Sequence, residues 1–89
     1  MTNKKILQRA LAQYGQRRQM RKCQEECAEL ITAINHYIEN PGTDTFVRLC
    51  EELADVDIML SQMLLAFNDR GQVTVYTARK LERLAEAVQ

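Results

Sequence analysis

The chain has 89 residues with no formal net charge, and 46% of them are hydrophobic and 27% charged. This length accommodates a single domain, residues 1–89, and the composition excludes disordered, collagen-like and linker-rich chains. Because the chain has no apolar run of about 18 residues, no signal peptide and an odd number of cysteines, we expect a cytoplasmic protein with reduced thiols and no membrane partner.

The basic and acidic residues are unevenly distributed along the chain. The first 24 residues carry seven basic and no acidic side chains, whereas the remainder carries twelve acids and five bases. A basic segment of this kind can bind nucleic acid or another polyphosphate. A solvated helix face that pairs with the acidic remainder is the favoured interpretation, so nucleic acid is not the expected partner.

Breaks at three glycines divide the chain into four segments that we predict to be helices: residues 3–14, 16–39, 44–69 and 73–88. A proline and a glycine at positions 41 and 42 end the second segment, because proline interrupts a helix and glycine tolerates a left-handed backbone. Thr43 and Asp44 are expected to cap the third segment with their side-chain oxygens. The fourth segment begins with the β-branched Val73–Thr77 but continues with strong helix formers, which predicts a helix with an irregular start.

Apolar residues recur at helical spacing in the two central segments. The apolar stripe of the second segment consists of Met20, Cys23, Cys27, Leu30, Ile31, Ile34 and Ile38. The stripe of the third segment consists of Phe46, Leu49, Leu53, Val56, Leu60, Leu64 and Phe67. The third segment has further apolar residues off its stripe, which indicates burial on more than one side and hence a partner subunit. We therefore predict an all-α fold, a four-helix protomer of antiparallel helical hairpins that assembles into a dimeric or tetrameric bundle.

An acidic motif occurs twice, 26 residues apart, since Glu25–Leu30 matches Glu51–Val56 in residue character at every position. In each copy, two acids at i and i+3 lie on the same side of the apolar stripe. The acids at these positions are Glu26, Glu29, Glu52 and Asp55. If the two stripes pack against each other, the four carboxylates converge at the edge of the interface.

Four carboxylates close together repel one another, and a bound divalent cation relieves that repulsion. Oxygen ligands without His or Cys favour Mg²⁺ or Mn²⁺ over Zn²⁺ or Cu²⁺. An acid pair on one helix is usually just solvated, and it is the duplication with matched angles that favours a site. A di-iron bundle would need Glu-x-x-His motifs, which the chain lacks because its only histidine, His36, follows Glu29 by seven residues. Cys23 and Cys27 lie on the apolar stripe and are interpreted as core residues.

The two acidic motifs resemble those of the MazG-type all-α nucleoside triphosphate pyrophosphatases. The family pattern is Glu-Glu-x-x-Glu followed by Glu-x-x-Asp. Here it reads Glu25-Glu26-Cys27-Ala28-Glu29 and, after a gap of 22 residues, Glu52-Leu53-Ala54-Asp55. The Tyr14-Gly15 step, Gln19 and the sequences EECAELITAI and EELADVDIML are similar as well, so the resemblance spans residues 10–88.

The resemblance implies Mg²⁺ as the cofactor, with Mn²⁺ as an alternative, held by Glu26, Glu29, Glu52 and Asp55. It also implies a homodimer or homotetramer that hydrolyses NTP or dNTP between the α- and β-phosphates, releasing the monophosphate and pyrophosphate. Glu29 is the expected group that orients or deprotonates the attacking water, with Glu25 as the alternative. The candidate substrate-binding residues are Gln19, Lys22, Lys80 and Arg83.

Two interpretations of function stay open at the level of the sequence. The first is the Mg²⁺-dependent pyrophosphohydrolase, which the four aligned acids favour. The second is a non-catalytic helical dimer that binds nucleic acid or a protein partner through its basic N-terminal arm. Asp57, inside the apolar stripe of the third segment, either pairs with a base from another helix or contributes to the site.

Overall fold

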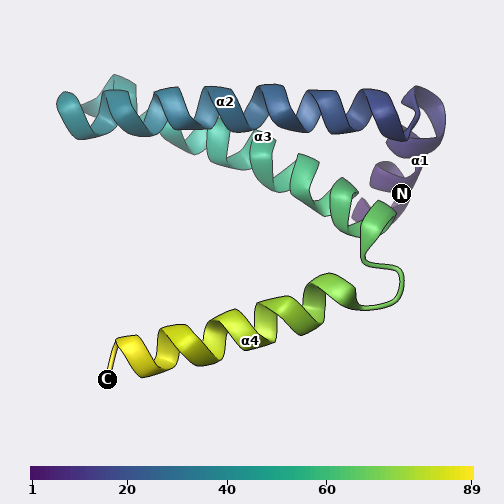
Figure 1. Cartoon of the computed structure of the whole chain (residues 1–89). Helices are drawn as coiled ribbons and strands as arrows, with labels where there is room; N and C mark the ends of the chain where they lie inside the picture. Colours follow the sequence, from purple (N-terminus) through teal and green to yellow (C-terminus); the bar gives the residue numbers. More distant parts are fainter.

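The computed structural model describes all residues, 1–89, and helices cover 87% of the chain, with no strands. The four helices are α1 (Asn3–Tyr14), α2 (Gln16–Glu39), α3 (Thr43–Phe67) and α4 (Gln72–Ala87) (Figure 1). The predicted all-α class is confirmed. Each helix also begins and ends within two residues of its predicted segment.

A single residue, Gly15, joins α1 to α2. The start of α1 is capped by the hydroxyl of Thr2, which accepts a hydrogen bond from the Lys5 amide at 3.2 Å. Gly15 has φ 87° and ψ 151°, backbone angles that glycine adopts and that residues with a Cβ avoid. Its amide donates to the Leu11 carbonyl at 2.9 Å, so α1 stays hydrogen-bonded up to the residue at which the chain turns.

The connection between α2 and α3 is stabilised by the hydroxyl of Thr45. This hydroxyl accepts a hydrogen bond from the Gly42 amide at 3.1 Å and donates to the Asn40 carbonyl at 2.9 Å. The prediction that Thr43 and Asp44 cap the helix is wrong, because both residues lie inside α3 and Gly42 holds the capping position. Thr45 replaces the missing cap from within the first turn, where the Asp44 carboxylate also adds a favourable charge.

The start of α4 is regular, although the residues that begin it are β-branched. The Asn68 side-chain oxygen accepts hydrogen bonds from the amides of Val73 at 2.8 Å and Thr74 at 3.3 Å, and its nitrogen donates to the Thr74 hydroxyl at 3.0 Å. Gly71, with φ 75°, supplies the left-handed residue that the turn requires. Asn68 therefore satisfies amides at the start of α4 and allows the helix to begin at Gln72.

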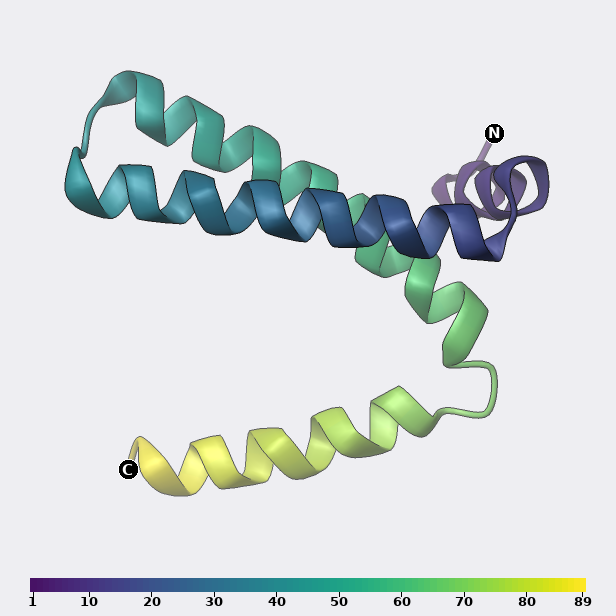
Figure 2. The same cartoon turned by 45° about the horizontal axis from the view of Figure 1, so that its top comes forward.

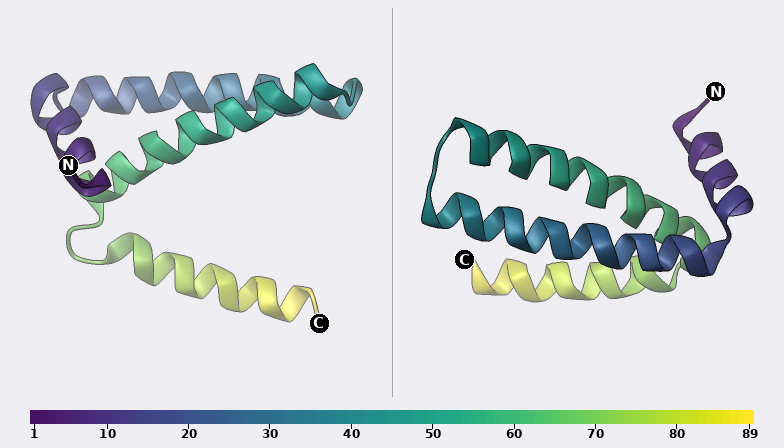
Figure 3. Two further views of the ribbon diagram at one scale, coloured as in Figure 1. Left: turned by 180° about the vertical axis from the view of Figure 1, so that it is seen from behind. Right: turned by 90° about the horizontal axis from the view of Figure 1, so that it is seen from above.

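α2 and α3 lie side by side, with α3 leading back from the connection at residues 40–42 (Figures 1 and 2). α1 crosses one end of this pair and packs on both helices (Figure 3). α4 contacts only α3, close to the loop that joins them, and has no buried residue. The chain is therefore open, with a radius of gyration of 15.7 Å, where a compact domain of this length would have about 12 Å.

The buried faces of α2 and α3 differ from the predicted apolar stripes. The buried hydrophobic residues are Cys23, Ala33, Val56 and Met59. Large members of the predicted stripes stay on the surface, with Ile31 68%, Leu53 49% and Leu60 48% exposed. The two stripes are therefore only partly buried within the chain, through Cys23 and Val56. The interface is rotated toward the polar sides of both helices, so that it also buries Gln19, Glu26, Glu52 and Gln62.

Candidate metal and substrate site

Polar side chains occupy much of the buried interface between α2 and α3. The buried polar residues are Gln19, Glu26, Glu52 and Gln62, each at most 7% exposed. Gln19 Nε2 donates a hydrogen bond to Gln62 Oε1 at 2.7 Å. Each of the two glutamates has one oxygen, Oε2, that is buried and accepts no hydrogen bond. A buried carboxylate oxygen without a partner is costly, so these two atoms lie where a positively charged ligand would be strongly stabilised.

Glu26, Glu52 and Asp55 form the acidic cluster. One carboxylate oxygen from each of these residues lies within 4.8 Å of the other two. Glu26 comes from α2, whereas Glu52 and the exposed Asp55 lie one turn apart on α3. The structure thus brings together three of the four predicted ligands, from both acidic motifs. The expected position at the edge of the interface is wrong for Glu26 and Glu52, because the rotated interface buries them.

Glu29, the fourth predicted ligand, lies exposed beside the acidic cluster. It is close enough to Glu52 to influence that side chain's protonation. The pKa of Glu52 is raised, first because burial removes water from the carboxylate and second because Glu29 and Asp55 repel its negative charge. The Arg48 guanidinium acts in the opposite direction with a smaller effect. All four predicted ligands therefore belong to one electrostatic environment.

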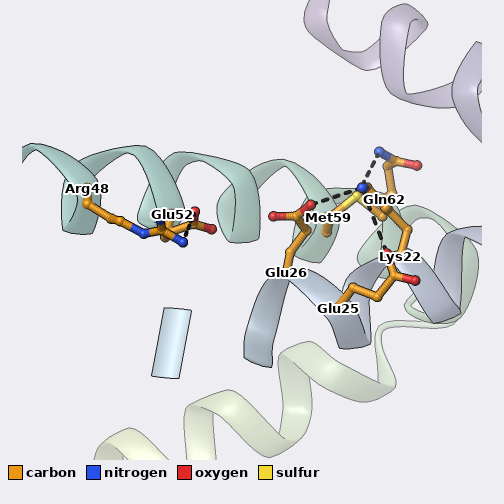
Figure 4. Close-up of polar contacts among 7 residues, drawn as sticks. All are labelled: Lys22, Glu25, Glu26, Arg48, Glu52, Met59 and Gln62. Atoms are coloured by element: carbon orange, nitrogen blue, oxygen red, sulfur yellow. Dashed lines mark hydrogen bonds and ion pairs between the residues drawn. The ribbon is translucent and has the colours of Figure 1, made fainter. Parts of the chain in front are cut away.

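Two basic side chains approach the two glutamates of the acidic cluster, as Figure 4 shows. Lys22 Nζ lies 3.2 Å from Glu26 Oε1, and Arg48 Nη2 lies 3.8 Å from Glu52 Oε1. The pKa of Lys22 is raised, mainly by its hydrogen bond to Glu26 and by the charge of that carboxylate. Both basic side chains are more than half exposed, and each approaches only one oxygen of its glutamate. The acidic cluster therefore keeps two buried oxygens that no basic group reaches.

The predicted substrate-binding residues fall into two groups. Gln19 and Lys22 lie on α2, within two turns of Glu26 on the side toward its N-terminus. Lys80 and Arg83 lie exposed on α4 and form no ion pair with the acidic cluster or with any other residue. The structure thus brings Lys22 into contact with the acidic cluster, places Gln19 two turns away on the same helix, and leaves the second pair on the separate helix.

Three further predicted residues lie outside the acidic cluster. The Glu25 side chain is 66% exposed and lies 3.9 Å from Lys22 Nζ. His36 is exposed, as expected for a surface residue. Asp57 is exposed as well and lines a small depression with Ile6 of α1, where it forms no ion pair. Within this chain Asp57 therefore neither pairs with a base nor joins the cluster.

All three cysteines are free in the structure. Cys23 is buried and Cys27 is half-buried, as expected of core residues, whereas Cys50 is exposed. Burial raises the pKa of the Cys23 thiol, with a smaller contribution from Cys27. None of the three contributes to the acidic cluster.

Two residues near the site were not anticipated from the sequence. Arg48 could have been found, because it precedes Glu52 by four residues on a predicted helix and such pairs meet on one face. Gln62 carries no comparable local signal. Its role depends on the alignment of α2 with α3, which places it opposite Gln19.

Comparison of the chain with protein-family models, with characterised proteins and with solved structures gave no match. No stretch of the four helices combines the length and the hydropathy that a bilayer crossing requires.

Proposed function

We propose that this protein is a cytoplasmic, Mg²⁺-dependent nucleoside triphosphate pyrophosphohydrolase that cleaves NTP or dNTP between the α- and β-phosphates. The observation that carries the proposal is the pair of buried, unpartnered oxygens, Glu26 Oε2 and Glu52 Oε2, beside the Asp55 carboxylate. The reaction class rests on the resemblance of the two acidic motifs to those of the MazG-type pyrophosphatases. The free cysteines are in keeping with a reducing compartment.

The acidic cluster fits a hard divalent cation. All its donor atoms are carboxylate oxygens, which Mg²⁺ and Mn²⁺ prefer, and no histidine or cysteine is among them. Glu26, Glu52 and Asp55 would hold the cation, and Glu29 would complete the set from the exposed side. When bound, the cation would neutralise phosphate charge and polarise the phosphoryl oxygens.

The basic side chains at the acidic cluster have a complementary role. Lys22 and Arg48 would bind phosphate oxygens through charge-assisted hydrogen bonds. The Lys22 ammonium lies at the end of a flexible chain and is more than half exposed, so it can leave Glu26 for a phosphate without movement of the backbone.

Glu29 is the proposed general base. Its carboxylate is exposed beside Glu52, which leaves room for a water molecule next to it. It would accept a proton from this water as the oxygen attacks the triphosphate, and pyrophosphate would leave as the phosphoanhydride bond breaks. Glu26 and Glu52 are too deeply buried to serve this role.

We also propose that two or four copies of this helical-hairpin protomer assemble through the apolar surface of α3. This proposal is supported by the exposure of large apolar side chains along α3: Phe46, Leu53, Ile58, Leu60, Leu64 and Phe67 are each at least 41% exposed. A surface of this kind is unusual for a monomer, and a second copy provides the matching apolar surface.

The proposed activity is tested by incubating the protein with each common NTP and dNTP in the presence of Mg²⁺. Pyrophosphate, orthophosphate and nucleoside monophosphate are measured separately. We expect equal amounts of pyrophosphate and monophosphate, and no turnover in EDTA. The variant Glu52→Gln should be inactive, whereas Glu86→Gln, a matched change on α4, should be as active as the wild type.

Orthophosphate as the main product, or full activity in EDTA, would show that this reaction is not the one catalysed. A salt-dependent shift of DNA mobility without release of pyrophosphate would instead favour the non-catalytic dimer with a basic arm.

A further inference from the structure

A cavity of about 670 Å³ lies beside the acidic cluster at the end of α2 that faces α1. Its lining includes Gln19, Gln62, Tyr14 and Arg18, together with Lys22, the residue that also contacts Glu26. Its volume is in the range of small-molecule sites in proteins. The cavity and the acidic cluster are therefore adjacent, and they share one basic side chain.

The hydrogen-bonded amides of Gln19 and Gln62 retain unused capacity for hydrogen bonds. Their mutual bond, at 2.7 Å, occupies one donor of Gln19 and the carbonyl of Gln62. The Gln19 carbonyl is left as an acceptor, and the Gln62 amide nitrogen is left as a donor whose only other contact is the weak acceptor Met59 Sδ at 3.7 Å. Rotating both amides by half a turn exchanges the oxygen and nitrogen of each side chain. The pair again keeps one free donor and one free acceptor. Such a pair complements the edges of nucleobases, on which donors and acceptors lie next to each other.

Tyr14 and Arg18 supply planar groups on the same cavity. The Arg18 guanidinium carbon lies 5.3 Å from the centre of the Tyr14 ring, and the tyrosine is 47% exposed. Aromatic rings and guanidinium planes stack on nucleobases of any kind, because every base has a π-face. The cavity therefore combines hydrogen-bonding groups for the edge of a base with planar groups for its face.

The spacing along α2 agrees with the dimensions of one nucleotide. Gln19 and Glu26 are seven residues apart, about 10 Å along the helix. A ribose and an α-phosphate bridge a separation of this order between a base and the outer phosphates. We infer that this cavity binds the base of the nucleotide whose triphosphate lies at the acidic cluster. This inference rests on the proposed function.

The experiment compares a nucleotide with the same phosphate chain without a base. The ligands are ATP, GTP, CTP and UTP analogues with a methylene group between the α- and β-phosphates, and inorganic tripolyphosphate, each titrated calorimetrically with Mg²⁺ present. We expect the wild type to bind the best nucleotide at least about fivefold more tightly than tripolyphosphate, from stacking and edge contacts. The variant Tyr14→Leu should remove most of that advantage and leave tripolyphosphate binding unchanged.

Tyr76 on α4 provides a matched control. Arg79 lies over its ring at 5.7 Å, as Arg18 lies over Tyr14, but this pair is far along the sequence and outside the cavity. Tyr76→Leu should bind every ligand as the wild type does. Retained tripolyphosphate binding shows that a variant is folded.

The outcomes separate the two proposals. Equal wild-type affinity for nucleotides and tripolyphosphate would overturn the inference of a base site and leave the proposed function standing. Equal effects of Tyr14→Leu and Tyr76→Leu would also overturn it. If neither a nucleotide nor tripolyphosphate binds in the presence of Mg²⁺, the proposed function itself fails, and the base site fails with it.

Discussion

Glu52 of the candidate site is buried and lies close to other carboxylates. Burial, followed by repulsion from Glu29 and Asp55, raises its pKa above the usual value of 4.5. A carboxyl group whose pKa is raised in the folded state makes its full contribution to stability below pH 4.5, where it is protonated in both the folded and the unfolded state. This stabilisation is lost as the pH rises through the raised value of the folded state.

Replacing Glu52 by glutamine should therefore raise the melting temperature of the metal-free protein at neutral pH. The neutral amide keeps the shape of the side chain and removes the unfavourable charge. The gain should vanish below pH 4.5, where the wild-type carboxyl is itself neutral. The measurement is thermal unfolding in EDTA at neutral pH and below pH 4.5. Glu86→Gln is the control and should change the melting temperature at neither pH. A lower melting temperature for Glu52→Gln at neutral pH would mean that the ionised Glu52 is stabilised in the fold.

The Lys22 side chain leads to a second prediction about a single residue. Its ammonium lies 3.2 Å from the Glu26 carboxylate, which would bind the cation. A lysine in this position competes with the cation for Glu26. We expect Lys22→Met to bind Mg²⁺ or Mn²⁺ roughly twofold to fivefold more tightly than the wild type, as measured by titration without nucleotide. Lys80→Met, which removes an equal charge from α4, should leave the affinity unchanged. Weaker metal binding by Lys22→Met would show that the lysine supports the metal site.

The candidate ligands themselves could be predicted from residue types and spacing, because two acids at i and i+3 on a helix necessarily share a side. The burial of Glu26 and Glu52 could not be predicted. Whether Glu26 lies at the centre or the edge of an interface depends on how α2 is rotated about its axis. That rotation is decided by contacts with residues far away in the sequence, such as Gln62.

At the scale of the elements, the helix boundaries could be predicted because the signals are local. Glycines and a proline interrupt the helical pattern whatever the rest of the chain does. The regular start of α4 is the exception, since it depends on the Asn68 side chain reaching the amide of Val73 five residues later. The buried faces of α2 and α3 could not be predicted, because each helix has an apolar side and a polar side, and contacts between residues far apart in the sequence decide which side is buried.

The joint between α1 and α2 gives a prediction about backbone conformation. An added Cβ at Gly15 meets no atom within 4 Å, so space alone would permit alanine. The backbone angles, φ 87° and ψ 151°, are nevertheless adopted almost exclusively by glycine. We expect Gly15→Ala to destabilise the protein by about 1–3 kcal/mol in denaturant unfolding.

Gly42 is the matched position for this test. Its backbone is extended, with φ −171°, and an added Cβ would lie 4.0 Å from the Asn40 carbonyl oxygen, an ordinary contact. Gly42→Ala should therefore change the free energy of unfolding by less than about 0.5 kcal/mol. Equal effects of the two substitutions would show that α1 does not depend on the conformation of Gly15.

For the whole molecule, the apolar surface of α3 leads to a prediction about assembly. We expect light scattering to give a mass at least twice the 10.3 kDa of one chain. Leu60, 48% exposed on α3, would contact a second copy in the proposed assembly. Leu60→Lys should lower the mass toward that of the monomer and reduce thermal stability, because the charge would be buried in the interface. Gln8→Lys, the same charge on exposed α1, should keep the wild-type mass. A wild-type monomer at micromolar concentration would contradict the proposed assembly.

The polar contacts between α2 and α3 also have a consequence for the register of the two helices. Gln19 bonds to Gln62 at one level, and Glu26 meets Glu52 and Asp55 at another. Sliding one helix by a single turn, about 5 Å, would break the amide bond and leave two buried amides without partners. An apolar interface tolerates such a slip far better, because one aliphatic side chain then replaces another. The hydrogen-bonded amides of Gln19 and Gln62 thus set the register of α2 against α3. This register determines which carboxylates meet two turns away.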